Sequence, residues 1–218
     1  MIKAVLFDLD GTIINSEEGI TKCVQYALSC FGIEEPDRKK LLCFIGPPLD
    51  PVFREKYGFD ADKAWQAVLK YRERFDKTGI FECELYEGVA DTIRKLKEEG
   101  YIIALASSKP ETACRRILEH FPLTSYFDEI VGSTLDGSIS TKQQVLEELG
   151  RRMEHMQITK DEMCLIGDTE YDVIGANQFG IRCVGVSYGF GKREQLERAG
   201  AYCVCDSMAE VVDALQQM

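Results

Sequence analysis

Four aspartates stand where apolar runs of the sequence end and strand ends are therefore expected. Asp8 and Asp10 follow the run that ends at Phe7, and Asp168 and Asp172 follow a second such run. Open parallel sheets bind ligands at the carboxyl ends of their strands, so these carboxylates are expected at one edge. Carboxylates that converge repel one another and need a cation to hold them together. Because this set offers oxygen alone, with no His or Cys, it predicts Mg²⁺ rather than zinc or copper.

A third strand end carries Ser107, whose hydroxyl could donate a hydrogen bond to a phosphate oxygen. Main-chain amides at the start of the next helix could do the same. An aspartate at a strand end is, by itself, at least as often a helix cap or a turn residue. We interpret Asp128 and Asp136, which are expected near the same edge, in that way. The turn Asp-x-Asp-Gly-Thr at residues 8–12, the serine and a later Gly-Asp-x-x-x-Asp are, in this order, hard to explain by chance.

Short apolar runs alternate with helical patterns over most of the chain, which predicts an α/β fold with a doubly wound parallel sheet. Gly100 and Gly180 stand where two of the helices are expected to end. The predicted strands are 2–7, 101–106, 162–166, 181–186 and 201–205. The predicted helices are 89–99, 111–121, 141–155, 170–179, 194–199 and 208–217.

One long stretch breaks this alternation, because between about Ser16 and Cys83 only helical periodicity is present. Ser16 is expected to cap a helix, and a later helix carries a stripe, including Trp65, that we expect to belong mostly to a core. We therefore predict a Rossmann-like core made of residues 1–15 and 84–218, with an inserted all-helical domain at 16–83.

Composition narrows the classes of partner. The chain has 218 residues and a formal net charge of −11, which argues against a nucleic-acid polymer or an anionic membrane as partner but not against one small phosphate ligand. The nine cysteines include no CxxC pair, and we interpret them as reduced core thiols. Neither a signal peptide nor a membrane span is recognisable, so we expect a cytoplasmic monomer or homodimer.

Taken in chain order, these motifs resemble the haloacid dehalogenase superfamily, specifically its phosphatases with an aspartate nucleophile. Residues 8–12 resemble the first motif of that family, Ser107 the second, Lys142 the third and residues 167–172 the fourth. The helical insert resembles the C1-type cap of the family. The segments 46–49, 106–110 and 188–191 resemble the branch of phosphoglycolate phosphatase and 5′-nucleotidase-like enzymes.

The resemblance implies a phosphatase acting on a small phosphate ester. Asp8 would attack phosphorus and form an aspartyl-phosphate, and Asp10 would act as general acid and then general base. Ser107 and Lys142 would bind phosphoryl oxygens. We also assign Ser108, Gly11 and Thr12 to substrate binding because they belong to these motifs.

The resemblance further implies a Mg²⁺ site formed by Asp8, the Asp10 main-chain carbonyl, Asp168, and water molecules held partly by Asp172. Asp172 could instead orient Lys142. The spacing between the motifs favours Lys142 over Lys109 as the lysine of the site. We expect Lys109 to begin the helix that contains Pro110 and to reach solvent.

The cap would close over the site and select the leaving group. Its candidate contacts with substrate are basic residues that we otherwise interpret, for the most part, as a solvated face: Arg54, Lys56, Arg72, Arg74 and Lys77. The alternative enzyme is a sugar phosphomutase of the β-phosphoglucomutase type, although that pattern departs from this chain after Gly11. Two other readings are a phospho-accepting receiver module and a catalytically idle binding protein. The possible substrates are 2-phosphoglycolate, a nucleoside monophosphate, a sugar phosphate and pyrophosphate.

Overall fold

Six short strands pair in parallel into one sheet with the order β5-β4-β1-β6-β7-β8. The computed structural model describes residues 1–218. The central strand β1 is fully buried and pairs with β4 and β6, so that Phe7 lies beside Leu105 and Ile166. The doubly wound parallel sheet expected from the sequence is therefore confirmed. The six strands are β1 (Ala4–Phe7), β4 (Ile102–Pro110), β5 (Glu129–Ser133), β6 (Met163–Gly167), β7 (Arg182–Val186) and β8 (Cys203–Cys205).

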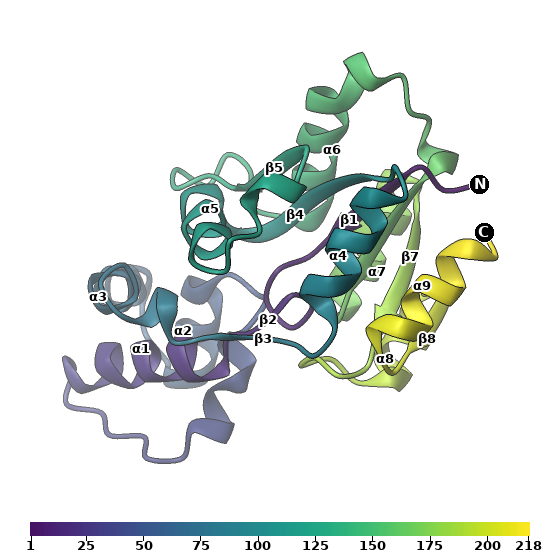
Figure 1. Ribbon diagram of the computed structural model, residues 1–218. Helices are drawn as coiled ribbons and strands as arrows, with labels where there is room; N and C mark the ends of the chain where they lie inside the picture. Colours follow the sequence, from purple (N-terminus) through teal and green to yellow (C-terminus); the bar gives the residue numbers. More distant parts are fainter. The chain divides into compact units, whose positions relative to one another are not determined.

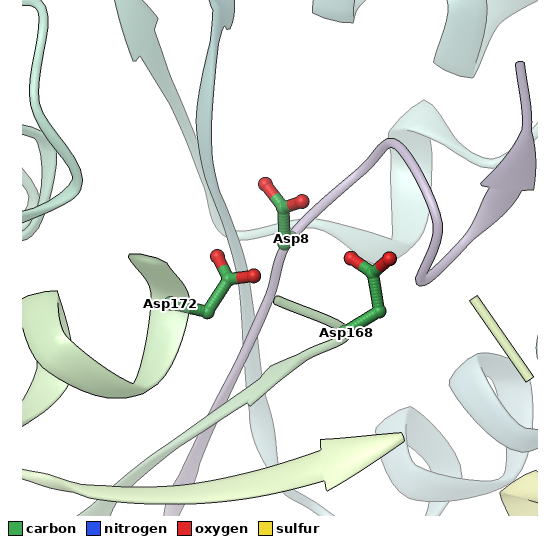
Figure 2. A group of neighbouring side chains, drawn as sticks. All are labelled: Asp8, Asp168 and Asp172. Carbon is green, nitrogen blue, oxygen red and sulfur yellow. The ribbon is translucent and has the colours of Figure 1, made fainter. Parts of the chain in front are cut away.

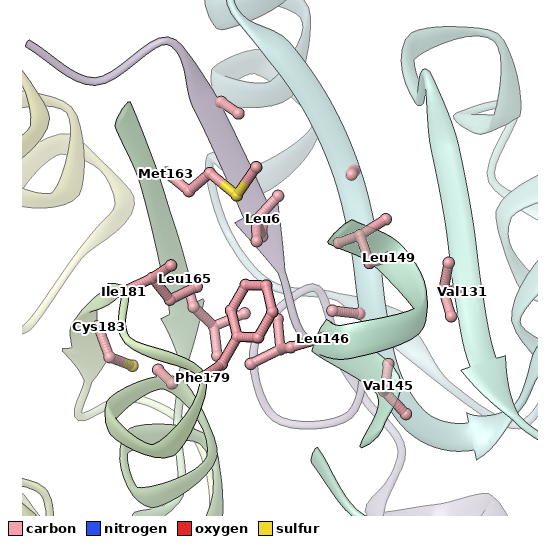
Figure 3. Packing of buried hydrophobic residues seen from close by; sticks show 14 of the residues in the cluster. Leu6, Val131, Val145, Leu146, Leu149, Met163, Leu165, Phe179, Ile181 and Cys183 are labelled. Carbon is pink, nitrogen blue, oxygen red and sulfur yellow. The ribbon is translucent and has the colours of Figure 1, made fainter. Parts of the chain in front are cut away.

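Helices cover the sheet on both faces. On one face, apolar side chains of α6, α7 and α8 pack on alternate residues of the strands, and Figure 3 shows Leu146 and Phe179 at the centre of this cluster. On the other face, α4 packs against α9 (Figure 1). The helices of this part of the chain are α4 (Val89–Glu98), α5 (Glu111–His120), α6 (Lys142–Met153), α7 (Glu170–Phe179), α8 (Arg193–Ala199) and α9 (Met208–Gln216), with short 3₁₀ turns η3 (Thr124–Tyr126), η4 (Glu154–Met156) and η5 (Lys160–Glu162).

The chain divides into two compact units. One unit contains Met1–Asn15 and Leu85–Met218, and the other contains Ser16–Glu84, one residue beyond the boundary expected at 83. The chain leaves the first unit through the two-residue strand β2 (Ile14–Asn15) and returns through β3 (Glu84–Leu85), and these two strands form a small sheet of their own. None of the helices is both long and apolar enough to cross a membrane.

The inserted unit is helical, as its periodicity predicts. Within it, the guanidinium group of Arg74 donates to both carboxylate oxygens of Glu82, at 2.7 and 3.0 Å. Arg74 is thus engaged inside this unit and is not a free substrate-binding cation. The elements of the unit are α1 (Glu17–Ser29), η1 (Arg38–Phe44), α2 (Leu49–Tyr57), α3 (Ala61–Phe75) and η2 (Gly79–Phe81).

Three local features were missed by the sequence analysis or differ from it. Strand β5 was not predicted, because its apolar run is only Ile130-Val131 before Gly132. Ser16 precedes α1 but makes no side-chain capping bond, since its ψ of 11° lies outside the extended region that capping requires. Trp65 is 46% exposed, although its neighbours Ala64 and Val68 in the same stripe are buried.

Candidate active site

Three aspartates from three elements bring their carboxylates together at the carboxyl edge of the sheet. Asp8 follows β1, Asp168 follows β6, and Asp172 lies in the first turn of α7 (Figure 2). One oxygen from each lies within 4.8 Å of the others, and the residues are 8%, 0% and 1% exposed. The register explains the approach of the first two, because β1 and β6 are neighbours and the Asp8 N–H donates to the Ile166 carbonyl at 2.9 Å.

Lys142 supplies the positive charge inside this cluster. Its Nζ lies 2.6 Å from Asp8 Oδ1, 2.7 Å from Asp172 Oδ1 and 2.7 Å from the Ala106 carbonyl oxygen. Lys142 is the first residue of α6, which is fixed by a capping box between Thr141 and Gln144. Burial by itself would lower the pKa of Lys142, but the carboxylates of Asp172 and Asp8 outweigh it and hold that pKa above its ordinary value.

The carboxylates remain in an unfavourable setting in spite of this lysine. Burial, opposed by Lys142, raises the pKa of Asp8 from 3.8 to about 6. Burial, followed by the nearby charges of Asp172 and Asp8, also raises the pKa of Asp168 above its ordinary value. Three buried carboxylates beside one ammonium group leave negative charge unbalanced. This all-oxygen donor set fits a hard divalent cation such as Mg²⁺.

The raised pKa of Asp8 predicts an unusual dependence of stability on pH in the metal-free protein. The folded state binds this proton more tightly than the unfolded state, whose pKa is near 3.8. The group therefore favours folding below about pH 4 and loses that contribution as the pH rises through about 6, by an amount on the order of 3 kcal/mol.

Urea unfolding of metal-free wild type and Asp8→Asn at pH 4.5 and pH 7.5 tests this prediction. We expect the variant to be the more stable protein at pH 7.5, with a smaller advantage at pH 4.5, because Asn carries no charge at either pH. The difference in the free energy of unfolding between the two proteins at each pH removes the contributions of the other titrating groups. An advantage that is the same at both values of pH would contradict the prediction.

Asp10 lies in the turn after Asp8, and its partner corrects an expectation from the sequence. Lys109 Nζ lies 2.9 and 2.8 Å from the two carboxylate oxygens of Asp10, and the Lys109 side chain is 7% exposed. The prediction that Lys109 reaches solvent is therefore wrong. Strand β4 continues to Pro110, so Lys109 belongs to the strand end and its ammonium group is held at the site edge.

Ser107 and Ser108 occupy the same end of β4. Ser107 is buried, and its Oγ accepts a hydrogen bond from the Lys109 N–H at 3.3 Å. It directly follows Ala106, whose carbonyl oxygen accepts from Lys142, so Ser107 lies next to the cluster. Ser108 is only partly buried, one residue further along the strand.

Gly11 and Thr12, predicted to bind substrate, both lie against Asp168. Gly11 has a φ of +83°, and a Cβ there would lie 2.0 Å from Asp168 Oδ2, so only glycine fits. The buried Thr12 hydroxyl lies 3.5 Å from Asp168 Oδ1. Both residues therefore help to position the Asp168 side chain. Their contact with substrate stays a prediction.

A loop after β7 also contacts Asp168, and the sequence reasoning gave it no role at the site. The Phe190 N–H donates to Asp168 Oδ2 at 2.7 Å, and Tyr188 Oη donates to the Thr12 carbonyl at 2.9 Å. In the sequence, the segment 188–191 only resembles a motif of the family. Its signal was the pair Gly189 and Gly191, since closely spaced glycines often mark a near approach of backbone to another group.

Asp128 and Asp136 lie outside the cluster. Asp128 precedes β5, at the opposite end of that strand, so the expectation that it lies near the site edge is wrong. There it accepts hydrogen bonds from the Ile103 N–H and from Lys97 Nζ. Asp136 accepts from Ser138 N and Oγ in a turn, as predicted.

The site thus combines a buried carboxylate paired with lysine, a separate carboxylate on the adjoining turn, and an acidic set that fits a hard cation. Residues 5–186 match the family of haloacid dehalogenase-like hydrolases. The 5′-nucleotidase of Pseudomonas aeruginosa is 39% identical over 212 residues, which cover 97% of this chain and 95% of that protein. The Tyrosine-protein kinase PtkA of Mycobacterium tuberculosis is 30% identical over 213 residues, which cover 98% of this chain and 71% of that protein.

Solved structures are also similar to this chain over its whole length. The crystal structure of a predicted phosphatase from Clostridium acetobutylicum superposes with a TM-score of 0.93 at 44% identity and covers 100% of both chains. Because the match covers both chains completely, it includes the core strands and the inserted helical segment.

Proposed function

Because the chain belongs to the haloacid dehalogenase-like hydrolase family, we propose that it is a Mg²⁺-dependent phosphatase that cleaves small phosphate monoesters through an aspartyl-phosphate on Asp8. The observation that carries the proposal is the buried contact of Lys142 with both Asp8 and Asp172, with Asp168 beside them. This arrangement supports a nucleophile that is held in one orientation before the substrate arrives.

In the first step, an oxygen of the Asp8 carboxylate forms a bond to phosphorus while the bond from phosphorus to the ester oxygen breaks. Lys142 already holds Asp8 Oδ1 at 2.6 Å and so orients the carboxylate for attack through its other oxygen. Ser107, at the adjoining end of β4, would donate its hydroxyl to a phosphoryl oxygen.

Asp10 would give its proton to the leaving alkoxide and then take a proton from the water that attacks the aspartyl-phosphate. The second attack breaks the bond between Asp8 and phosphorus, so inorganic phosphate leaves and the Asp8 carboxylate is restored. Lys109, which contacts both oxygens of Asp10, would position the ionised form of this residue, which acts as the base in the second step. Only Leu9 stands between Asp8 and Asp10, so one turn presents both to the same phosphoryl group.

Asp8 and Asp168, with the Asp10 main-chain carbonyl, would hold Mg²⁺. When bound, the ion supplies positive charge that offsets the repulsion between the Asp8 carboxylate and the phosphoryl oxygens. Both oxygens of Asp172 are already engaged, one by Lys142 and the other by Thr169 N and Oγ1 at 3.0 and 2.7 Å. This favours a role for Asp172 in orienting Lys142 and in contacting the ion through water.

The comparisons rank the candidate leaving groups. The similarity to a protein named 5′-nucleotidase puts nucleoside 5′-monophosphates first, ahead of 2-phosphoglycolate, sugar phosphates and pyrophosphate. The unit Ser16–Glu84 would act as the cap that selects among them.

A phosphate-release screen over these four classes of substrate tests the proposal. We expect release to require Mg²⁺, to stop when a chelator is added and to return when Mg²⁺ is restored. Asp91→Asn is a matched control, because Asp91 is an exposed aspartate of α4 that pairs only with Arg94 nearby. It should retain the wild-type rate, and a folded wild-type protein that releases phosphate from none of the four classes would contradict the proposal.

A further inference from the structure

The loop Tyr188–Gly191, which we call the brace, contacts two parts of the site at once. On one side, Tyr188 Oη donates to the carbonyl of Thr12, in the turn that carries Asp8 and Asp10. On the other side, the Phe190 N–H donates to Asp168 Oδ2. The two hydrogen bonds measure 2.9 and 2.7 Å, and only Gly189 separates their donor residues.

Gly189, between the two donor residues, lies close to both Asp168 and the turn. A Cβ at this position would lie 2.4 Å from the Asp168 side chain and 2.4 Å from the carbonyl oxygen of Gly11. The brace therefore lies against both the turn and Asp168, with no room for a side chain at residue 189. A segment that contacts both groups in this way restricts how they can move relative to each other.

The Tyr188 side chain is held independently of its hydroxyl group. Its ring lies 4.8 Å from the ring of Tyr86, measured between centroids, and the Tyr86 N–H donates to the Ile13 carbonyl at 3.1 Å. Burial raises the pKa of Tyr188, so the hydroxyl stays protonated and donates. Removal of the hydroxyl alone should thus leave the ring in place and break the link to Thr12.

We infer that Tyr188 is a positioning residue: its hydroxyl holds the turn of Asp8 and Asp10 at a fixed distance from Asp168, which the same loop holds through Phe190 N–H. The inference rests on the proposed function, since it concerns the residues that would share a divalent ion. The Phe190 N–H holds the Asp168 carboxylate by a hydrogen bond from outside the ligand set, and loss of such a partner typically costs 10- to 100-fold in metal affinity. Tyr188 anchors the loop that carries this donor, so we expect its loss to have an effect at the lower end of that range.

Binding of Mn²⁺, followed by the electron paramagnetic resonance signal of the free ion, tests the inference without any turnover. For Tyr188→Phe we expect Mn²⁺ affinity to fall by about tenfold, with kcat falling by a similar factor and KM unchanged within about twofold. The melting temperature of the metal-free protein should change little. Tyr202→Phe is the matched control, because Tyr202 is exposed, and it should match wild type in all four measurements.

Gly189→Ala is the second variant, and it should weaken Mn²⁺ binding more than Tyr188→Phe because its Cβ meets Asp168 directly. It decides the matter if Tyr188→Phe does not fold. Unchanged Mn²⁺ affinity in the folded variants would overturn the inference, as would a wild-type protein that binds no Mn²⁺. A wild type that binds Mn²⁺ but cleaves no ester would instead overturn the proposed function and leave the role of the brace standing.

Discussion

Asp8→Asn is expected to abolish phosphate release, with kcat lower by about 10⁴-fold or more, as is found when a catalytic nucleophile is removed. The amide has the shape of the carboxylate but no negative charge and little nucleophilicity toward phosphorus. Rapid acid quench of wild type during turnover, followed by mass spectrometry of the peptide that contains residue 8, should detect a phosphorylated species that the variant lacks. Residual activity above about 1% of wild type would show that Asp8 is not the nucleophile.

This loss of activity should come with a gain in stability. Because burial raises the pKa of Asp8 to about 6, the carboxylate that the folded metal-free protein carries near neutral pH destabilises it relative to the unfolded chain. Replacement by the neutral amide removes that cost. The combination separates loss of a nucleophile from simple unfolding, which would lower activity and stability together.

Asp10→Asn is expected to have the second-largest effect, and its size should depend on the leaving group. For an alkyl phosphate we expect kcat to fall by about 10³-fold, because the alkoxide cannot leave without a proton. For p-nitrophenyl phosphate, whose leaving group is a weak base, formation of the aspartyl-phosphate should be nearly as fast as in wild type. Hydrolysis of that intermediate should be slow, because the base that activates water is missing.

Stopped-flow measurement of p-nitrophenol should therefore show a burst of one equivalent per site in Asp10→Asn, followed by slow turnover. The variant Asp91→Asn should show no such burst. Equal losses for alkyl and aryl substrates, with no burst, would mean that Asp10 positions the substrate and does not transfer a proton. That result would leave the assignment of Asp8 intact.

The sheet and the acidic cluster could be predicted from the sequence. Buried parallel strands appear as continuous apolar runs, and residues just after them meet at one edge, which places Asp8 and Asp168 together. Lys142 was predicted by motif spacing, and it contacts Asp8. The inserted segment was evident because its apolar residues keep a helical period where strands would have been expected.

The rest depends on side-chain direction and on main-chain donors, which the identities of the contacting residues do not reveal. Lys109 has a long, flexible side chain at a strand end, and the run of residues does not say whether it turns to solvent or to Asp10. Phe190 acts through its N–H, so the identity of its side chain gives no sign of the contact with Asp168. Trp65 shares a helical stripe with buried residues but lies at its border, where a large ring remains half exposed.

The insertion after β2 also bears on the order in which the molecule can assemble. The central strand β1 is the first of the six to leave the ribosome, but its two partners begin at Ile102 and Met163. Its four buried apolar residues therefore stay unpaired while Ser16–Glu84 is synthesised, and that helical segment has contacts local enough to form first. The same central position that later places Asp8 at the site leaves β1 unpaired and prone to aggregation during synthesis, and folding yield should depend on chaperones that bind short apolar strands.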